Sequence, residues 1–211
     1  MQLKLQLHYM RYIFFAQGLP IEKQLLGDNV AHIGENSMGA SPKTTDFLKE
    51  CMADALLQAM TKKPFSKITI NEIAETAGVN RSTWFRNFND KNEAITFKLI
   101  LLWNRWADGH EIKERRRYTL GNANDFFAFN YSIKNLLSEI YREELQACVY
   151  NAFYQVMMPQ YGANPAECYE ARFYSYGLFG FLDEWIKRGF YETPEQITEL
   201  FQKMMRGKEI V

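Results

Sequence analysis

Hydrophobic positions recur at helical spacing along most of this chain from about residue 44 onward. The clearest stripe runs through residues 44–61, where apolar side chains follow the i, i+4 spacing of a buried helix face. The stripe consists of Phe47, Leu48, Cys51, Met52, Ala55, Leu56, Ala59 and Met60. We therefore predict a helix that begins at Thr44 or Thr45 and ends before Pro64.

Two shorter helices separated by a glycine turn are predicted over residues 69–91. Thr69 and Glu72 have the spacing of a capping box, which marks the start of the first helix. Gly78 favours the left-handed conformation of a sharp helix exit, and Val79 then fills the corner. The buried side of this helix comprises Ile73, Ala74 and Ala77.

The second short helix of this segment is predicted to present a polar outer surface. Asn80 is a favourable N-cap, and the apolar positions Trp84, Phe85 and Phe88 recur at helical spacing. The side chains left for the outside are Arg81, Ser82, Thr83, Arg86 and Asn87. These donors and acceptors are of the kinds that read base edges and phosphates, so the pattern indicates a DNA-binding helix-turn-helix.

Residues 79–91 resemble the recognition segment of the TetR family of transcriptional regulators. The family's run is a valine, a small polar cap, short residues, leucine, tyrosine, two variable residues and phenylalanine, followed by a lysine. Here it extends from Val79 to Phe88, with Lys91 following, and the resemblance covers residues 44–100. Two positions depart from it: Trp84 replaces a common leucine, and Phe85 replaces a tyrosine whose hydroxyl usually contacts a phosphate.

The resemblance and the side-chain chemistry together predict the DNA contacts. Thr69 and Lys91 are expected at phosphates, because both lie where a helix N-terminus favours an anion. Arg86 can reach either a base or a phosphate. The expected base-side set is Arg81, Ser82, Thr83 and Asn87, and the N-cap residue Asn80 is also expected at the DNA.

The remainder of the chain predicts further helices and no strand. A second capping box, Asp90 and Glu93, opens a helix that reaches about residue 107. Residues 124–158 fit two helices that meet near residues 134–141. Pro165 opens a long helix that Gly189 closes, and a third capping box at Thr193 opens the last one. The expected fold is all-α, with about nine helices in total.

Gly177 and Gly180 lie within a strongly apolar helix, where each costs about 1 kcal/mol relative to alanine, so a close approach is expected there. The segment resembles the penultimate helix of TetR regulators, which packs against its symmetry mate in a four-helix interface. The predicted homodimer interface is Tyr176, Gly177, Gly180, Phe181, Trp185, Ile197 and Phe201. Packing within the chain is the alternative explanation.

The same resemblance implies a pocket for a small-molecule effector among the body helices. The segment is rich in aromatic residues and methionine, which suits a flat or hydrophobic molecule. The candidates are Trp103, Trp106, Phe126, Phe127, Tyr150, Phe153, Tyr154, Met157 and Tyr174. For each of them, a plain core position is the alternative.

Composition narrows the class of protein further. The 211 residues have a formal net charge of zero, which argues against a generic polyanion binder. Residues 62–91, however, carry six basic and three acidic side chains, a balance of +3, whereas residues 111–211 carry 12 basic and 14 acidic.

The three cysteines are widely spaced and indicate neither a disulfide framework nor a metal site. No apolar run reaches the roughly 20 residues of a membrane span, so we expect a cytoplasmic protein.

These patterns predict three regions: an N-terminal extension over residues 1–42, a helix-turn-helix domain over residues 43–90, and an effector-binding and dimerisation domain over residues 91–211. The extension is either a genuine extra segment or the product of an upstream start codon or cloning. The expected function is a TetR-type regulator, usually a repressor, that binds palindromic operator DNA as a dimer.

A coregulator of the same fold that acts mainly through protein partners is the alternative. An enzyme is not expected, because the sequence has no phosphate loop, no metal-binding spacing and no nucleophile motif. No cofactor is expected either.

Overall fold

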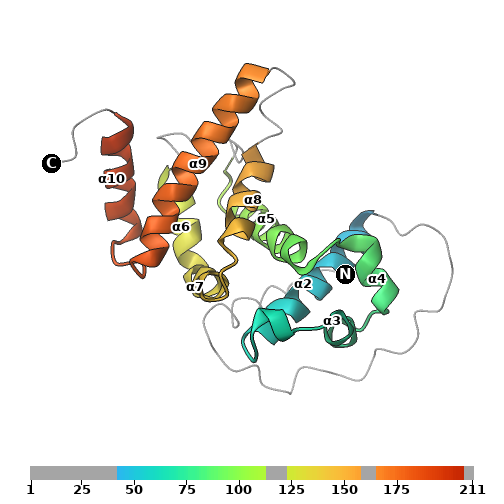
Figure 1. The fold of residues 1–211 in the computed structure, drawn as a ribbon. Helices are drawn as coiled ribbons and strands as arrows, with labels where there is room; N and C mark the ends of the chain where they lie inside the picture. The colour runs from blue at the N-terminus through green and yellow to red at the C-terminus, as the bar shows by residue number, and fades with distance from the viewer. Residues whose placement is uncertain (1–41, 113–122, 158–164, 207–211) are drawn as a thin grey trace. The chain divides into compact units, whose positions relative to one another are not determined.

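The computed structural model describes residues 42–112, 123–157 and 165–206 (Figure 1). The chain divides into two units, residues 1–41 and residues 42–211, and all described residues belong to the second. Apart from Pro42, the predicted N-terminal extension therefore lies outside the described residues. The described ranges contain nine α-helices, a short 3-10 helix and no strand, which confirms the predicted all-α class.

Three helices and a 3-10 turn form the part that we call the head. They are α2 (Pro42–Met60), η2 (Phe65–Lys67), α3 (Ile70–Ala77) and α4 (Arg81–Asn87), and α2 packs against both α3 and α4 (Figure 1). The first helix begins two residues before the earlier of its predicted starts and ends as expected.

The head has a core built around Trp84, which is fully buried. Its ring centroid lies 5.1 Å from that of Phe88, and Met52 and Leu56 of α2 are fully buried as well. Burial of such large apolar side chains is the main term that stabilises a small helical unit. Phe47 is an exception to the predicted stripe, because it is 57% exposed on α2.

The long helix α5 (Lys91–Gly109) packs against α2 of the head and against α8 of the body. Asp90 caps it by accepting a hydrogen bond from the Glu93 backbone N–H at 2.8 Å. The predicted capping box is only half formed, since the Glu93 carboxylate accepts from the Asn89 backbone N–H, at 2.7 Å, instead of from Asp90.

We use the name body for α5 together with the five helices that follow it. Residues 123–157 form three helices, not the two predicted: α6 (Ala123–Ser132), α7 (Lys134–Arg142) and α8 (Gln146–Met157). The extra break falls at Ile133, which is buried and leaves the helical conformation with no glycine or proline to mark it. The second break follows Glu144, which adopts a left-handed φ of 59°.

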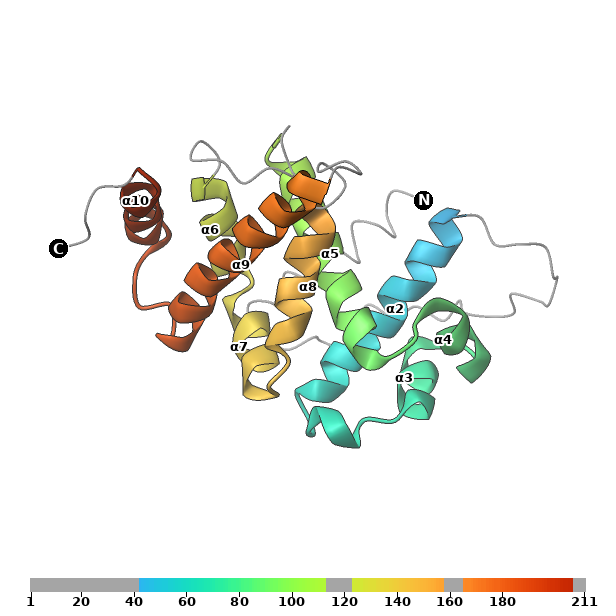
Figure 2. The same ribbon diagram turned by 45° about the horizontal axis from the view of Figure 1, so that its top comes forward.

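The last two helices are α9 (Pro165–Lys187) and α10 (Pro194–Met205). Figure 2 shows α9 lying along α8, while α10 packs on α6. Gly189 ends α9 with a left-handed φ of 69°, and the capping box of Thr193 and Gln196 opens α10, both as predicted.

Aromatic rings fill the space between α6, α9 and α10. The Phe127 ring lies 5.8 Å from Phe181, 5.7 Å from Trp185 and 5.6 Å from Phe201, between centroids. Edge-on contacts of this kind add to the stabilisation from burial. None of the described helices combines the length and the apolar character that a membrane span requires.

Candidate nucleic-acid interface and internal cavity

Local sequence fixes the angle at which α4 leaves α3. The Thr69 hydroxyl accepts from the Glu72 backbone N–H at 3.3 Å, and a Glu72 carboxylate oxygen accepts from the Thr69 backbone N–H at 2.9 Å, which confirms the predicted capping box. Gly78 adopts a φ of 67°, and the Val79 backbone N–H closes the turn on the Ala74 carbonyl at 2.9 Å. The helix-turn-helix geometry therefore follows from capping chemistry.

The outer face of α4, as we use the term, consists of the exposed residues at its N-terminal cap and along its solvent side. They are Asn80, Arg81, Ser82, Phe85 and Arg86. Phe85 is 56% exposed, and the Arg81 guanidinium carbon lies 5.2 Å from the centre of its ring. Phe85 thus belongs to the outside, although the sequence grouped it with the apolar positions.

Two residues that the sequence predicted as base contacts, Thr83 and Asn87, are not exposed on α4. Thr83 is only 9% exposed, and its hydroxyl accepts from Arg86 Nη2 at 3.2 Å. Asn87 is half-buried and donates from Nδ2 to the Thr83 carbonyl at 2.7 Å. Placing Thr83 on the outer face was wrong, because a seven-residue helix turns its third position toward the core together with Trp84.

Asn80 is the N-cap residue of α4, as predicted, with extended φ and ψ of −73° and 147°. Its side chain makes no capping hydrogen bond, however, and the first helical bond there runs from the Thr83 backbone N–H to the Asn80 carbonyl, at 2.8 Å. The exposed carboxamide is therefore left to face solvent or DNA.

The two predicted phosphate contacts are engaged within the chain. The Thr69 hydroxyl donates to Glu72 Oε2 at 2.8 Å, and Lys63 forms an ion pair with the same carboxylate. The Lys91 ammonium donates to the Phe65 and Ile68 carbonyls, at 2.5 and 2.9 Å. Burial, followed by the positive charge of Lys63, lowers the pKa of Lys91.

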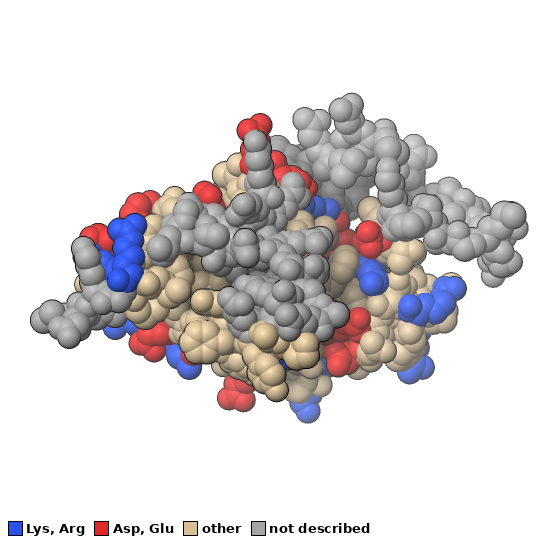
Figure 3. Space-filling model, turned by 90° about the horizontal axis from the view of Figure 1, so that it is seen from above, with Lys and Arg blue, Asp and Glu red and all other residues tan. Residues whose placement is uncertain are grey.

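On the face of the molecule in Figure 3, charge does not form a broad field of one sign. Among the coloured atoms of Figure 3, blue and red groups are interspersed and no wide region of one sign is visible. A neutral chain with scattered charges attracts DNA weakly at long range. Contacts made by the outer face of α4 would therefore have to supply most of the discrimination.

The body contains a small cavity between four helices. It has a volume of about 20 Å³, which is room for about one water-sized sphere. Its wall comes from α5 (Leu99, Ile100, Trp103), α6 (Phe126, Phe129, Asn130), Ile133, Leu137 of α7, and α8 (Val149, Ala152, Phe153, Val156).

Three of the nine predicted pocket residues line this cavity: Trp103, Phe126 and Phe153. Phe127 lies in the cluster between α6, α9 and α10, and Trp106 stacks on His110 with ring centroids 3.8 Å apart. Tyr150 and Tyr154 stack beside Arg172, whereas Tyr174 is 42% exposed. The Met157 side chain lies outside what the structure describes.

Two family models match separate parts of the chain. Residues 53–94 match the model described as bacterial regulatory proteins of the tetR family. Residues 128–207 match a model described as a transcriptional regulator C-terminal region. The chain belongs to the TetR family of transcriptional regulators. No curated protein matches it.

In this TetR family regulator, one side of α9 is exposed and apolar. Tyr169 and Phe173 are 79% and 75% exposed, and Tyr176 is 57% exposed. Gly177 and Gly180 lie on the same side, and a Cβ built on either would meet no atom within 4 Å. Among the residues that the structure describes, none makes the close approach that the sequence predicted at these glycines.

Other residues of the predicted dimer interface are core residues of the regulator. Trp185 is 1% exposed and donates from Nε1 to the Glu192 carbonyl at 3.0 Å. Ile197 and Phe201 are also buried, at 5% and 8% exposed. Their assignment to an interface was wrong, because the apolar side of α10 packs on α6 and the Trp185 ring packs against Phe127 of α6.

A cluster of charged side chains links α2 of the head to α5. The buried Lys98 ammonium lies 2.9 Å from Glu50 and 2.6 Å from Asp54, between N and O atoms. Arg105 holds the other Glu50 oxygen at 2.6 Å. Two acidic and two basic groups thus compensate each other in a place where an unpaired charge would be costly.

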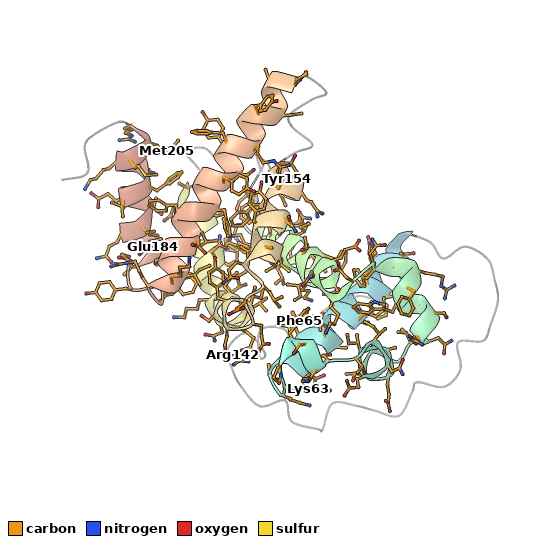
Figure 4. All side chains as sticks on the ribbon, in the orientation of Figure 1. Lys63, Phe65, Arg142, Tyr154, Glu184 and Met205 are labelled. Atoms are coloured by element: carbon orange, nitrogen blue, oxygen red, sulfur yellow. The ribbon has the colours of Figure 1, made fainter. Side chains whose placement is uncertain are left out.

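The C-terminal turn of α7 also touches the head. Glu143 Oε2 accepts from the Phe65 backbone N–H at 2.7 Å, and Arg142 Nη2 lies 3.5 Å from the Met60 carbonyl (Figure 4). At the other side of α7, the Tyr141 hydroxyl donates to Asp183 of α9 at 2.9 Å. Burial, followed by this hydrogen bond, raises the pKa of Tyr141.

The sequence did not identify the residues at these joints or the polar residue of the cavity wall, although a signal existed for Lys98 and Asn130. Lys98 follows Ala94 and precedes Leu102 by four positions, on the buried stripe of α5. Asn130 likewise follows the buried Phe126 by four positions. No sequence pattern could reveal Glu143, because its partner lies 78 residues away.

Among the described residues there is no group of metal-ligating side chains.

Proposed function

We propose that this regulator binds operator DNA through the outer face of α4. The observation that carries the proposal is the arrangement of Arg81, Ser82 and Arg86, which stand exposed on a short helix whose other side is anchored by the fully buried Trp84. A rigid helix with exposed arginine and hydroxyl side chains suits the major groove, where bidentate arginine reads guanine.

We test the proposal by gel retardation with the DNA that flanks the regulator's own gene. The wild-type protein should retard this DNA at low salt, with a steep loss of affinity as salt rises. Arg81→Ala should weaken cognate binding by about 1–3 kcal/mol if the side chain reads guanine. The matched control is Arg188→Ala, at an exposed position beyond α9.

The gel retardation results distinguish a base contact of Arg81 from a phosphate contact. An equal loss for Arg81→Ala on cognate and scrambled DNA would make the residue a phosphate contact. Absence of retardation at low salt by the purified protein would contradict DNA binding altogether.

We further propose that the operator-binding form is a homodimer and that its usual action is repression in the cytoplasm. A dimer presents two recognition helices to successive major grooves of a palindrome. The exposed apolar side of α9 supports this proposal, because such surface is favourable to cover.

Control by a small effector is the third part of the proposal. The cavity lies among α5, α6, α7 and α8, and Leu137 of its wall belongs to α7, whose C-cap residue is Glu143. A ligand that displaces α7 would change the Glu143 bond to Phe65, and with it the connection between α2 and α3. Ligand and DNA would then affect each other's affinity reciprocally.

A coregulator that acts through protein partners is the second candidate. It is favoured by the internal engagement of Thr69 and Lys91 and by the missing hydroxyl at Phe85, which together remove three phosphate contacts expected from the family resemblance. The gel retardation experiment decides between the two functions, because only the first requires binding to DNA.

A further inference from the structure

The cavity wall contains one polar side chain, the carboxamide of Asn130. The other eleven lining residues are apolar, and none is charged. Asn130 is only 1% exposed, so its polar group is buried among aromatic and aliphatic side chains. A buried carboxamide in such surroundings needs hydrogen-bond partners.

Only part of the carboxamide is satisfied by the chain. Its Nδ2 donates to the Phe126 carbonyl at 2.8 Å, a bond that fixes which end of the group is the nitrogen, because two oxygens could not form it. No described residue donates a hydrogen bond to Oδ1. The oxygen therefore remains as an acceptor in a wall that is otherwise apolar.

We propose that the body cavity binds a small, neutral, mainly aromatic molecule whose single hydrogen-bond donor is held by Asn130 Oδ1. This inference rests on the proposed effector control and names the ligand class for it. Trp103, Phe126 and Phe129 supply ring edges and faces for a flat apolar ligand. The donor must be an O–H or N–H, because the free partner in the wall is an oxygen.

Charged ligands do not fit this wall. A carboxylate would lose its hydration and find no cation among the lining residues. The nearest candidate along α5, the Lys98 ammonium, is already held by Glu50 and Asp54. The volume of about 20 Å³ also requires the helices to separate when a ring enters. Binding is thus coupled to movement of the wall, including Leu137 of α7.

Calorimetric titration of the full chain with phenol, toluene and benzoate tests the proposal. Phenol has a donor, toluene has the same shape without one, and benzoate carries a charge. We expect phenol to bind about 3- to 10-fold more tightly than toluene, which is the contribution of one neutral hydrogen bond. Benzoate should give no saturable heat over the same concentrations.

The variant Asn130→Leu should bind toluene at least as well as the wild type and lose its preference for phenol. Retained toluene binding shows that the variant is folded. Asn104→Leu, at an exposed position of α5, is the matched control and should keep the preference. In the wild type, phenol should also shift the Asn130 carboxamide signals in a nitrogen–proton NMR spectrum.

Equal affinities for phenol and toluene in the wild type would overturn the proposal, and would leave Oδ1 as a water-binding group. Tighter binding of benzoate, or no saturable binding of any probe, would overturn it too. These results are independent of gel retardation. Ligand binding without DNA retardation would contradict the proposed function and leave the ligand site intact, whereas retardation without ligand binding would do the reverse.

Discussion

Arg81 and Phe85 share one exposed surface of α4, with the guanidinium 5.2 Å from the ring centre. A hydroxyl added to the end of this ring would extend into solvent, where a DNA phosphate is expected to lie. We predict that Phe85→Tyr strengthens binding to both cognate and scrambled DNA by about tenfold, since a phosphate oxygen would accept a charge-assisted hydrogen bond. Fluorescence anisotropy with both duplexes measures the change.

The chain offers a close control for this variant. Phe47 is 57% exposed, nearly the same as the 56% of Phe85, but it lies on α2 outside the predicted DNA-binding set. Phe47→Tyr should leave both affinities unchanged. An equal gain from the two variants would show that the effect does not come from a phosphate contact at α4.

Glu72 has its carboxyl pKa lowered from 4.5 to about 2 by the Lys63 ammonium and by the Thr69 backbone N–H and hydroxyl. The folded chain therefore binds this proton less readily than the unfolded chain, and the carboxylate stabilises the fold at pH values above 4.5. We predict that this stabilisation is lost as the pH falls from 4.5 toward 2. Carboxyl carbon NMR measures the titration directly.

Lys63→Met removes the largest cause of the shift and should raise the pKa of Glu72. The capping hydrogen bonds from Thr69 remain in this variant, so the rise should stop short of the ordinary value. A wild-type Glu72 that titrates near 4.5 would contradict the arrangement of α3's first turn.

At the scale of elements, the charged cluster determines how α2 meets α5. Removal of Lys98 would take one cation away from Glu50, which is 4% exposed, and one from Asp54. We predict that Lys98→Met lowers the free energy of unfolding by about 3 kcal/mol, the scale of a broken buried pair. Chemical denaturation measures it.

The double variant Glu50→Gln with Lys98→Met removes one charge of each sign and should recover part of that loss. The surface variant Lys187→Met breaks an exposed ion pair with Asp183 and should change stability little. A loss for Lys98→Met no greater than for Lys187→Met would show that the cluster does not hold the two helices together.

The C-terminal end of α7 forms a second contact between body and head, through its C-cap residue Glu143. In Glu143→Ala the Phe65 backbone N–H loses its acceptor, which lies 2.7 Å away in the wild type. We predict faster hydrogen exchange at the Phe65 amide by about fivefold, because one hydrogen bond contributes about 1 kcal/mol to its protection. Amide exchange by NMR measures it, with Glu144→Ala on the exposed neighbour as control. Unchanged exchange at the Phe65 amide would show that the Glu143 hydrogen bond does not couple α7 to the head.

At the scale of the whole molecule, a Cβ added to Gly177 or Gly180 of α9 would meet no atom of the described residues within 4 Å. Side chains added there would be harmless to an isolated chain, and would even favour the helix. In a dimer that packs this side of α9 closely, the same side chains would separate the subunits. A larger side chain at either glycine should therefore leave the isolated chain folded but weaken the dimer.

We predict that Gly180→Leu weakens self-association by at least tenfold while the chain remains folded, since overpacking an interface costs about 1–3 kcal/mol. Analytical ultracentrifugation measures association, and circular dichroism checks the fold. Ser138→Leu, exposed on α7, is the control. A Gly180→Leu protein that dimerises as tightly as the wild type would exclude this side of α9 from the interface.

The parts of the fold that depend on near neighbours were predictable from the sequence. Capping at Thr69 and Thr193 and the left-handed turns at Gly78 and Gly189 involve residues a few positions apart, and all four were found as expected. The sequence placed a single helix junction near residues 134–141, where the structure has α7 between two breaks, because neither break contains a glycine or a proline. The all-α class followed from the helical spacing of the hydrophobic positions alone.

The sequence by itself determined which segments are helical, where most of them begin and end, and which short helix has the chemistry to read DNA. Those properties depend on hydrogen bonds and periodicity within a few residues. Only the tertiary structure decided that Thr83, Trp185 and Phe201 are buried and that Phe85 is exposed. It alone brought Glu143 to Phe65 and Asn130 to the cavity wall, because burial and long-range contacts depend on which helix covers which.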